Sequence, residues 1–521
     1  MLRKEKVQVF TLGLIFIALL FSFPTFAQNA SNGKEIFTIE QVLSAPFPSN
    51  LVAAPGAAKV AWVQNAGGVR NIWLAEGPDY KGRQLTSYAE DDGQELGGLQ
   101  FTPDNQNIIY VRGGGGNRQG EIPNPLSWPD GAKQEIWMAP ANGDSLRKLA
   151  EGNAPAISPT GDLVTFINRR QVWSVVLDAG SKPEQMFKIR GRAGSLHWSP
   201  DGSRLAFVSS RGDHSFVGAY HLDSKSLKYL DPSLDRDGSP VWSPDGNRIA
   251  FSRTPNQRQR LPFSPRRSAL PWSIRLSDVQ TGKGQEIWKA DEGPGSSFRF
   301  ISAANQLMWG DGNRLVFPWE KDGWTHLYAV SVNGGEAKLL TPGKFEVQFV
   351  SLAPDRKEVI YSSNQKDIDR QHLWRVAVSG SSPKQVTSGK GIEWSPVKIA
   401  GDNAIAFLSS AANMPAHASI ISSTNTARAL APESMPEDFP AQHLVAPQQV
   451  IFSAADGMKI HGQLFLPKKN KQGEKRPALL FFHGGSRRQM LLGFHHRGYY
   501  HNAYALNQYL ASRGFIVLSV N

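Results

Sequence analysis

Short apolar runs bounded by turn-forming residues recur along the chain between residues 52 and 408. The clearest turns are residues 198–202 and 242–246, which both read Trp-Ser-Pro-Asp-Gly and precede the apolar runs 205–208 and 249–251. Pro in the second place of a type I turn presets the backbone angle, while Ser and Gly suit the first and fourth places. Apolar residues on both sides of such a turn predict a β-hairpin.

These hairpins belong to a longer repeat. Weaker copies of the turn surround Pro55, Pro103, Pro159, Pro354 and Pro396. A third strand follows each hairpin, and several units close on a short fourth strand that ends in Thr. Most units are about 40–55 residues long, and one longer interval holds two units. The repeat predicts an all-β propeller of eight four-stranded blades, with seven blades as the alternative because the first and sixth units are degenerate.

Two further features of the repeats bear on binding. The tryptophans recur at fixed places in the strands, so we expect them in blade cores and not in a platform for a ligand. Residues 113–130 are rich in Gly and Pro, and residues 253–271 carry five arginines among prolines, of which Arg253 is the first. Both stretches predict solvent-exposed loops. The alternative for the second loop is that its arginines meet a substrate carboxylate.

The last 70 residues follow a different pattern. The apolar runs 450–452, 460–466, 478–482 and 515–520 predict four strands, and a helix is expected over residues 502–513. The first two strands form a hairpin around an Asp-Gly turn, and the last two form a parallel unit with the helix as crossover. The expected apolar face of the helix consists of Ala503, Leu506, Tyr509 and Leu510.

Composition and charge exclude several classes of site. The 521 residues contain no cysteine, so disulfides, thiol chemistry and cysteine metal sites are excluded. The formal charge is +12, but Lys and Arg are scattered and form no long basic run, which argues against nucleic-acid binding. His495, His496 and His501 lie close together in sequence on what we expect to be a flexible polar loop. We therefore predict no metal site there and no cofactor elsewhere.

The first 27 residues have the pattern of an export signal. Arg3, Lys4 and Lys6 precede an apolar run of about 15 residues, and small residues stand at the cleavage positions of Thr25-Phe26-Ala27. The run is short for a membrane span, which needs roughly 20 residues. We expect cleavage, export to the periplasm or the extracellular space, and no stable membrane insertion of the mature chain.

The combination of these features resembles one enzyme family. Ser-Pro-Asp-Gly repeats lead into Asp-Gly, His-Gly and Leu-Pro, then Phe-Phe-His-Gly-Gly at residues 481–485, then Tyr-Leu-Ala-Ser-Arg-Gly-Phe-Ile-Val-Leu-Ser-Val-Asn at the end. This order is similar to the N-terminal portion of the prolyl oligopeptidase family of serine peptidases, near its exported bacterial dipeptidyl-peptidase and acylaminoacyl-peptidase branches. The resemblance implies a propeller followed by the first part of an α/β-hydrolase domain.

The resemblance also assigns a site. His483, Gly484 and Gly485 match the loop that supplies backbone N–H groups beside the oxyanion hole. The catalytic Ser, Asp and His of the family are expected after Asn521, because no Gly-x-Ser-x-Gly motif occurs in the 521 residues. No catalytic residue is assigned within this chain. The family's fifth hydrolase strand is likewise absent, so residues 478–482 are expected to form an exposed apolar edge.

The predicted organisation is a signal peptide at 1–27, an N-terminal segment with a short helix at 28–48, a propeller at 49–428, a linker at 429–447 and an incomplete hydrolase domain at 448–521. The predicted function is the N-terminal part of a secreted or periplasmic serine peptidase that hydrolyses short peptides, with the propeller gating access and the 521 residues alone inactive. The alternative is a non-catalytic binding propeller of the TolB type. The adjacent Glu-Glu pair of the dipeptidyl-peptidase branch is absent, so peptide preference stays open, as does oligomeric state.

Overall fold

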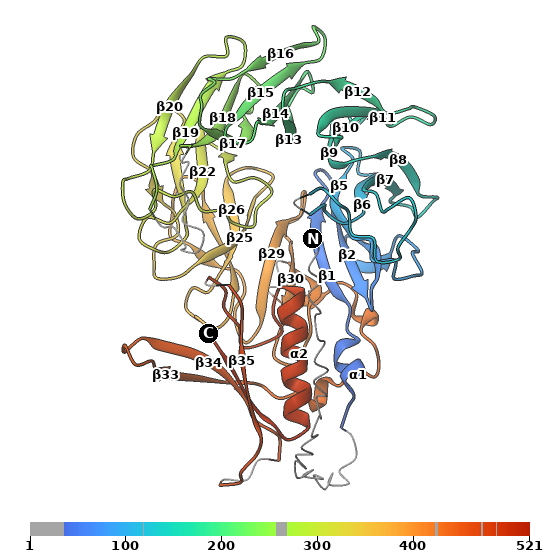
Figure 1. Ribbon diagram of the computed structural model, residues 1–521, viewed down its shortest axis with the longest axis vertical. Helices are drawn as coiled ribbons and strands as arrows, with labels where there is room; N and C mark the ends of the chain where they lie inside the picture. The colour runs from blue at the N-terminus through green and yellow to red at the C-terminus, as the bar shows by residue number, and fades with distance from the viewer. Residues whose placement is uncertain (1–35, 118, 257–267, 423–425, 470–472, 486) are drawn as a thin grey trace, which may run out of the picture. The chain divides into compact units, whose positions relative to one another are not determined.

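The computed structural model describes residues 36–117, 119–256, 268–422, 426–469, 473–485 and 487–521 (Figure 1). The export signal predicted at 1–27 lies outside this range. Within it, eight four-stranded antiparallel sheets follow one another along the chain, and a single parallel residue pair, Ser215 and Arg236, joins the fourth and fifth of them into one eight-stranded sheet. One mixed sheet follows them. This succession supports the prediction of a propeller-like all-β fold. No described helix is long and apolar enough to cross a membrane.

The strands of the first four sheets have the following bounds: β1 (Phe47–Ala53), β2 (Lys59–Ala66), β3 (Val69–Glu76), β4 (Lys81–Gln84); β5 (Leu96–Phe101), β6 (Asn107–Arg112), β7 (Glu135–Pro140), β8 (Arg147–Glu151); β9 (Asn153–Ile157), β10 (Leu163–Asn168), β11 (Gln171–Val176), β12 (Glu184–Phe187); β13 (Arg192–Trp198), β14 (Arg204–Ser210), β15 (Ser215–His221), β16 (Ser226–Tyr229).

The next four sheets have these bounds: β17 (Arg236–Trp242), β18 (Arg248–Thr254), β19 (Ser273–Asp278), β20 (Gly284–Lys289); β21 (Met308–Gly310), β22 (Arg314–Trp319), β23 (His326–Ser331), β24 (Lys338–Leu339); β25 (Val347–Leu352), β26 (Glu358–Ser363), β27 (His372–Ala377), β28 (Lys384–Gln385); β29 (Ile392–Lys398), β30 (Ile405–Ser410), β31 (His417–Ile421), β32 (Ala427–Ala429). In each sheet the strands pair in sequence order, as in a meander.

The Ser-Pro-Asp-Gly turns form as predicted between the first and second strands of their sheets. The N–H of Gly202 donates to the carbonyl oxygen of Ser199 at 2.9 Å, and Gly246 donates to Ser243 at the same distance. Both glycines have a positive φ, of 72° and 70°, a conformation that costs glycine least. The hydroxyl of Ser243 donates to Asp245, and this bond lowers the pKa of that carboxyl. The local sequence therefore specifies the hairpins.

The eighth sheet, β29–β32, packs against the first sheet, β1–β4, so that the eight sheets form a closed ring of neighbours. Trp62 of β2 and Trp394 of β29 are buried in one apolar core together with Leu430. The N–H of Gly82 in β4 donates to the carbonyl oxygen of Leu430 at 2.6 Å, and the hydroxyl of Tyr80 donates to Asp402 at 2.8 Å. The tryptophans at this contact lie in a core, as predicted.

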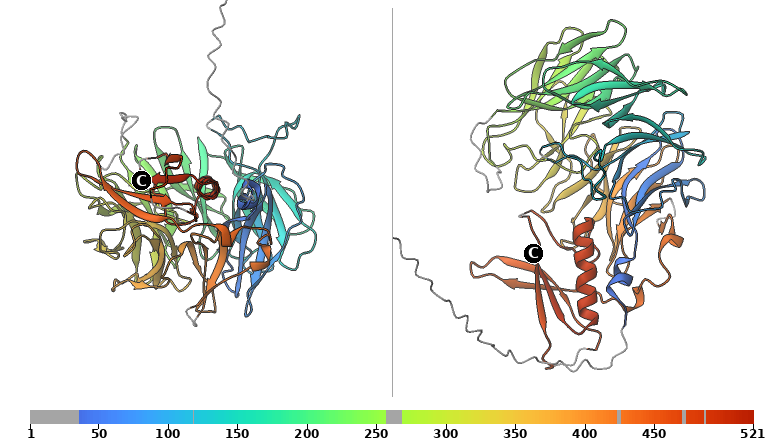
Figure 2. Two further views of the ribbon diagram at one scale, coloured as in Figure 1. Left: turned by 90° about the horizontal axis from the view of Figure 1, so that it is seen from below. Right: turned by 45° about the vertical axis from the view of Figure 1, so that its right-hand side comes forward.

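The 3-10 helices η1 (Pro432–Ser434) and η2 (Ala441–His443) lead to the final sheet, whose strands are β33 (Gln448–Ser453), β34 (Lys459–Phe465), β35 (Ala478–Phe482) and β36 (Ile516–Val520). Its order is β33-β34-β36-β35. β35 and β36 are parallel, and helix α2 (Gly498–Ser512) connects them and lies beside the sheet (Figure 2). All four predicted strands and the crossover are present.

Helix α2 differs from the prediction in its start and in its buried face. It begins at Gly498, four residues before the expected start, and Leu506 is 45% exposed. Tyr504 and Gln508 are buried instead, and their side chains donate to the carbonyl oxygens of Ala412 and Val445 at 2.9 and 2.7 Å. Polar groups buried with such partners are satisfied. The predicted apolar face is therefore confirmed for Tyr509 and Leu510, which pack against the core, and wrong for Leu506.

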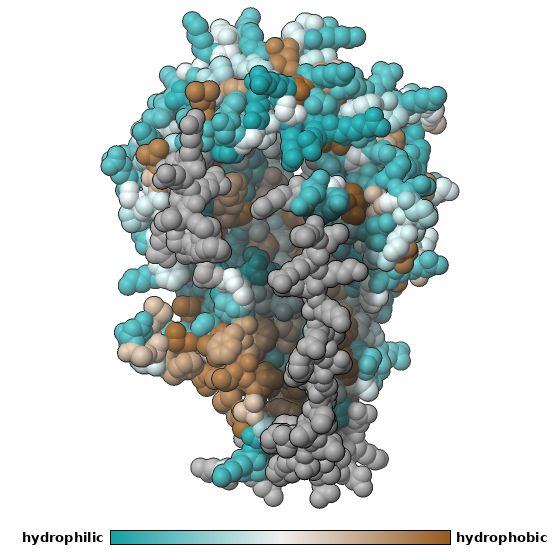
Figure 3. All heavy atoms as spheres, in the orientation of Figure 1, coloured by the Kyte–Doolittle hydropathy of each residue, from teal (hydrophilic) through white to brown (hydrophobic). Residues whose placement is uncertain are grey.

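β35 is an edge strand of the final sheet in the described residues, and β36 is its one neighbour. Leu480 and Phe482 are 59% and 67% exposed, and Ile451 and Phe452 of β33 are also exposed. Figure 3 shows this apolar area on the sheet. The expectation of an exposed apolar edge at residues 478–482 is therefore confirmed.

The short helix predicted within residues 28–48 is α1 (Ile39–Leu43), which begins with a capping box. The N–H of Gln41 donates to the hydroxyl of Thr38 at 3.2 Å, and the N–H of Thr38 donates to the side-chain oxygen of Gln41 at 2.9 Å. Phe37 and Val42 pack in the apolar core of the final sheet, with Phe465 and Tyr504. The segment before β1 thus joins the end of the chain.

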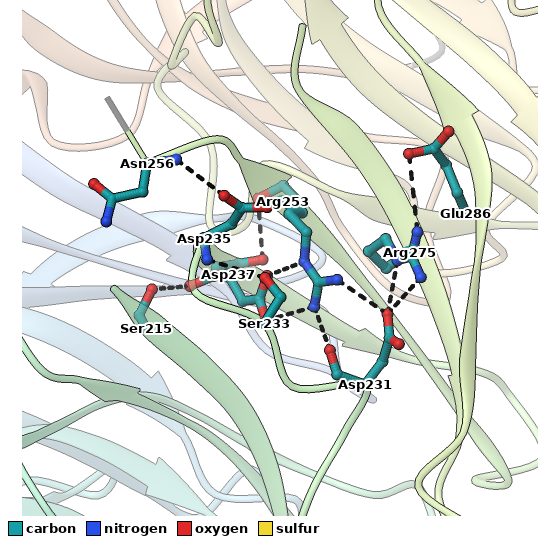
Figure 4. Close-up of polar contacts among 11 residues, drawn as sticks. Ser215, Asp231, Ser233, Asp235, Asp237, Arg253, Asn256, Arg275 and Glu286 are labelled. Atoms are coloured by element: carbon teal, nitrogen blue, oxygen red, sulfur yellow. Dashed lines mark hydrogen bonds and ion pairs between the residues drawn. The ribbon is translucent and has the colours of Figure 1, made fainter. Parts of the chain in front are cut away.

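A buried ion-pair network ties the connection between β16 and β17 to strands β17, β18 and β19 (Figure 4). Arg253, the first residue of the predicted exposed loop, lies instead in β18 and is 9% exposed. Its guanidinium donates to both carboxylate oxygens of Asp237 at 2.7 and 3.0 Å and to Asp231 at 3.2 Å. Asp231 also accepts from Arg275 at 2.7 Å. The loop prediction is wrong for Arg253, and residues 257–267 lie outside the described residues.

Replacing Asp237 with Ala should destabilise the fold by about 3 kcal/mol, because the substitution leaves a buried guanidinium without its bidentate partner. The measurement is the free energy of unfolding in urea. Asp291→Ala is the matched control, since it breaks the exposed Lys321–Asp291 pair of 2.9 Å, and we expect a loss of less than about 1 kcal/mol. Equal losses in the two variants would contradict a structural role for the buried pair.

Candidate functional site

The predicted site residues His483, Gly484 and Gly485 form the loop that directly follows β35. Gly484 and Gly485 are exposed, and Gly485 has a φ of +88°. The hydroxyl of Tyr500 in α2 accepts the N–H of Gly484 at 3.1 Å and donates to the carbonyl oxygen of the same residue at 2.9 Å. Arg488 donates to the same hydroxyl at 2.9 Å. One tyrosine thereby holds the backbone of this loop in place.

The segment that follows, residues 487–494, is bound to loops between the second and third strands of three successive sheets. Arg487 pairs with Glu320 at 2.7 Å. The N–H of Leu492 donates to the carbonyl oxygen of Asp369 at 3.0 Å, and the carbonyl oxygen of Phe494 accepts from the hydroxyl of Ser410 at 2.6 Å. Glu320 directly follows β22, Asp369 lies between β26 and β27, and Ser410 is the last residue of β30. The strand ends of the repeats therefore position the chain next to the predicted site.

Of the three clustered histidines, His495 and His501 are buried and His496 is half-buried, so the expectation of a flexible polar loop is wrong. The ring of His495 stacks on that of His496 at 4.1 Å between centroids, and His496 packs edge-on against Phe349. His501 lies between Phe47 and Phe494, at 5.1 and 4.7 Å. The apolar surroundings explain the burial, which the polar sequence of this stretch does not reveal. In the part of the chain that the structure describes, no group of three His, Asp or Glu side chains is arranged to hold a metal ion.

The surroundings keep these imidazoles neutral. Burial lowers the pKa of His495 to about 4 and that of His501 to about 3. Burial also lowers the pKa of His496 well below its usual value. His495 accepts the N–H of Arg497 at its Nδ1 and shares its Nε2 with the carbonyl oxygen of Gln489 at 3.0 Å. A neutral ring with its proton on Nε2 satisfies both contacts.

Charged groups from distant positions gather beside Arg487. Glu320 is buried at the end of β22, and burial raises the pKa of nearby Glu346, which accepts from the N–H and hydroxyl of Thr325 at 3.2 and 3.1 Å. Burial, followed by the charge of Arg487, lowers the pKa of Arg299. Sequence reasoning missed these residues because no local motif contains them.

A cavity of about 680 Å³ adjoins this group. Arg299 and Glu320 line it, together with Phe298 and Phe300. Phe300 is 71% exposed, and its ring lies 4.8 Å from that of Phe298. The cavity therefore combines aromatic walls with two arginines, Arg236 and Arg299, and two acidic residues, Asp237 and Glu320. Such a combination suits a short peptide, which carries both apolar and charged groups.

Comparison with known proteins shows which family part of the chain resembles. Residues 272–411 match the family described as dipeptidyl peptidase IV N-terminal region. This stretch is therefore similar to the N-terminal region of dipeptidyl peptidase IV. The probable dipeptidyl peptidase 4 of Emericella nidulans is 37% identical over 82 residues, and the match spans 15% of this chain and 11% of that protein. The predicted resemblance to the prolyl oligopeptidase family is thereby confirmed.

Solved structures share the fold. Dipeptidyl peptidase 4 of Porphyromonas gingivalis matches with a TM-score of 0.66 and 14% identity, over 94% of this chain and 74% of that chain. A puromycin-hydrolyzing peptidase of Mycobacterium tuberculosis matches with a TM-score of 0.60 and 15% identity, over 94% of this chain and 67% of that chain. Both likenesses of fold extend over 94% of this chain.

The buried histidines predict a specific dependence of stability on pH. Between pH 6.5 and about 4 the unfolded chain binds protons at His495 and His501 that the folded chain excludes. The free energy of unfolding therefore falls as the pH falls, by up to about 1.4 kcal/mol per pH unit for each histidine. Urea unfolding of the His501→Gln variant should show a shallower slope between pH 5 and 6.5 than the unsubstituted chain.

The control for this prediction is His443→Gln, because His443 is exposed in η2. This variant should keep the slope of the unsubstituted chain. An unchanged slope in the His501→Gln variant would show that its imidazole is not excluded from protonation by the fold.

Proposed function

We propose that this chain is the N-terminal part of an exported serine peptidase that hydrolyses short peptides. The eight four-stranded sheets, residues 49–428, correspond in this proposal to the blades of an eight-bladed propeller. Residues 28–48 form its N-terminal segment, residues 429–447 form the linker, and residues 448–521 form the first part of an α/β-hydrolase domain. Neither a cofactor nor a nucleic acid has a role in the proposed reaction.

The observation that carries the proposal is the binding of segment 487–494 to the strand ends of three sheets. Through the pair of Arg487 with Glu320, it holds the loop of His483, Gly484 and Gly485 near the cavity that Glu320 lines. A peptide in the cavity would have its reacting carbonyl close to the backbone N–H groups of the loop. Such donors stabilise the negative charge that develops on the carbonyl oxygen during acyl transfer.

The proposal divides the work between the parts of the protein. The backbone of Gly485 contributes to the oxyanion side, because the N–H of Gly484 already donates to Tyr500. The nucleophile, base and orienting acid are assigned to residues after Asn521. The sheets restrict access, so that short or unstructured peptides enter and folded proteins do not.

The first test uses a serine-directed phosphonate on the product of the complete reading frame that encodes these residues, and on the 521-residue chain alone. We expect the phosphonate to label the complete product and to abolish its hydrolysis of peptide p-nitroanilides. The 521-residue chain should be neither labelled nor active. Absence of labelling and hydrolysis in both would overturn the peptidase proposal and favour a binding propeller of the TolB type. Labelling of the short chain would overturn its predicted inactivity.

Gly485→Ala in the complete product should lower kcat by at least about tenfold. Its positive φ disfavours any side chain, and the added methyl group would lie 3.0 Å from Arg488, so the loop and its N–H donor shift. Gly457→Ala is the matched control, since Gly457 has a φ of +85° and open space around it in the turn between β33 and β34. Its kcat should be unchanged. Equal effects would remove the loop from the proposed mechanism.

A further inference from the structure

Four arginines line one surface cavity that lies away from the proposed catalytic loop. The cavity measures about 490 Å³, and its described lining consists of Arg170, Arg190, Gly191, Arg192, Ser210, Arg211 and Gly212. No acidic side chain is among these lining residues. Although the basic residues are scattered along the sequence, folding brings four of them together in this cavity.

Three separate segments contribute the arginines, and hydrogen bonds fix each segment. The carbonyl oxygen of Arg170, at the turn between β10 and β11, accepts the N–H of Ala193 at 2.9 Å. The carbonyl oxygen of Arg190 accepts the hydroxyl of Ser209 at 2.8 Å, and Arg192 pairs with Ser210 across β13 and β14. The close approach of the strands requires Gly191, since a methyl group there would meet the carbonyl oxygen of Ser210. The arrangement is thus part of the sheet framework.

No described carboxylate neutralises the four guanidinium groups. Across the described ranges, no carboxylate lies within ion-pair distance of Arg170, Arg190, Arg192 or Arg211. Arg211 is held by the rings of Phe216 and Tyr229, at 4.5 and 5.1 Å. Like charges held close together repel each other, and a bound anion would remove that cost.

The position of the cavity relates it to the proposed site. Arg170 and Arg211 lie in loops between the second and third strands of their sheets. The equivalent loops of three later sheets hold segment 487–494 through Glu320, Asp369 and Ala411. The arginines therefore occupy the same kind of strand end as the residues that position the oxyanion-side loop.

We propose that this arginine cavity binds an acidic peptide segment, one with two or more carboxylates within a few residues. Guanidinium groups donate paired N–H bonds to carboxylates, and an arginine keeps its charge when it is partly desolvated. The cavity is larger than one carboxylate requires, and four cations suit several. The choice of a peptide over another anion rests on the proposed peptidase function. The binding itself needs no catalysis.

The test is calorimetric titration of the 521-residue chain with the acetylated, amidated peptide Glu-Ala-Glu-Ala-Glu and with its Gln-Ala-Gln-Ala-Gln counterpart. We expect binding of the first peptide alone, weakening as NaCl rises from 50 to 500 mM. The double variant Arg190→Glu, Arg192→Glu should raise Kd by at least tenfold. Arg170→Gln, a milder change, should raise it less, and thermal unfolding checks that both variants fold.

The matched control is Lys384→Glu, Lys390→Glu, which changes the net charge equally at exposed positions in and after β28. It should leave Kd unchanged. Equal binding of the two peptides, or equal Kd in the two double variants, would overturn the proposal. Binding of pyrophosphate without binding of the acidic peptide would overturn the assignment to peptides. This test measures binding and not hydrolysis. Its outcome can therefore be distinguished from a failure of the peptidase proposal, which the phosphonate experiment would show.

Discussion

The contact between the first sheet, β1–β4, and the eighth sheet, β29–β32, is the constraint on which the other features depend. Trp62 and Trp394 share one buried core across this contact, and Leu491 of the segment after the predicted oxyanion loop packs into the same core. The core that closes the repeats therefore also anchors the segment. A change that loosens the closure would move the candidate site, although it touches none of the site's residues.

Two arrangements of polar and charged groups differ in this protein. The Arg253 network and the buried side chains of Tyr504 and Gln508 have partners and fasten neighbouring elements to each other. The arginine cavity has cations without carboxylate partners among the described residues. Satisfied groups of this kind serve the framework, whereas clustered like charges imply a ligand. The same side chain, arginine, serves both purposes a few strands apart.

Local chemistry made much of the fold predictable. The Ser-Pro-Asp-Gly turns, the capping box at Thr38 and the parallel unit of β35 and β36 each depend on neighbouring residues, and each is present. The wrong predictions concern burial that distant residues decide. His496 is covered by Phe349, and Arg253 is paired with Asp237. For the candidate site, the loop of His483 was visible as a motif, whereas Glu320 and Arg299 carry no local signal.

Closure also dictates an order of events when the chain is made. Tyr80 and Asp402, which bond across the contact, are 322 residues apart in sequence. A ribosome adds residues from the N-terminus at about 5–20 per second. The first sheet is therefore complete long before its final neighbour exists, and Trp62 lacks its covering surface for on the order of half a minute. During that interval the uncovered apolar surface of the first sheet is prone to aggregate. The beginning of the chain is therefore the part that most needs chaperones.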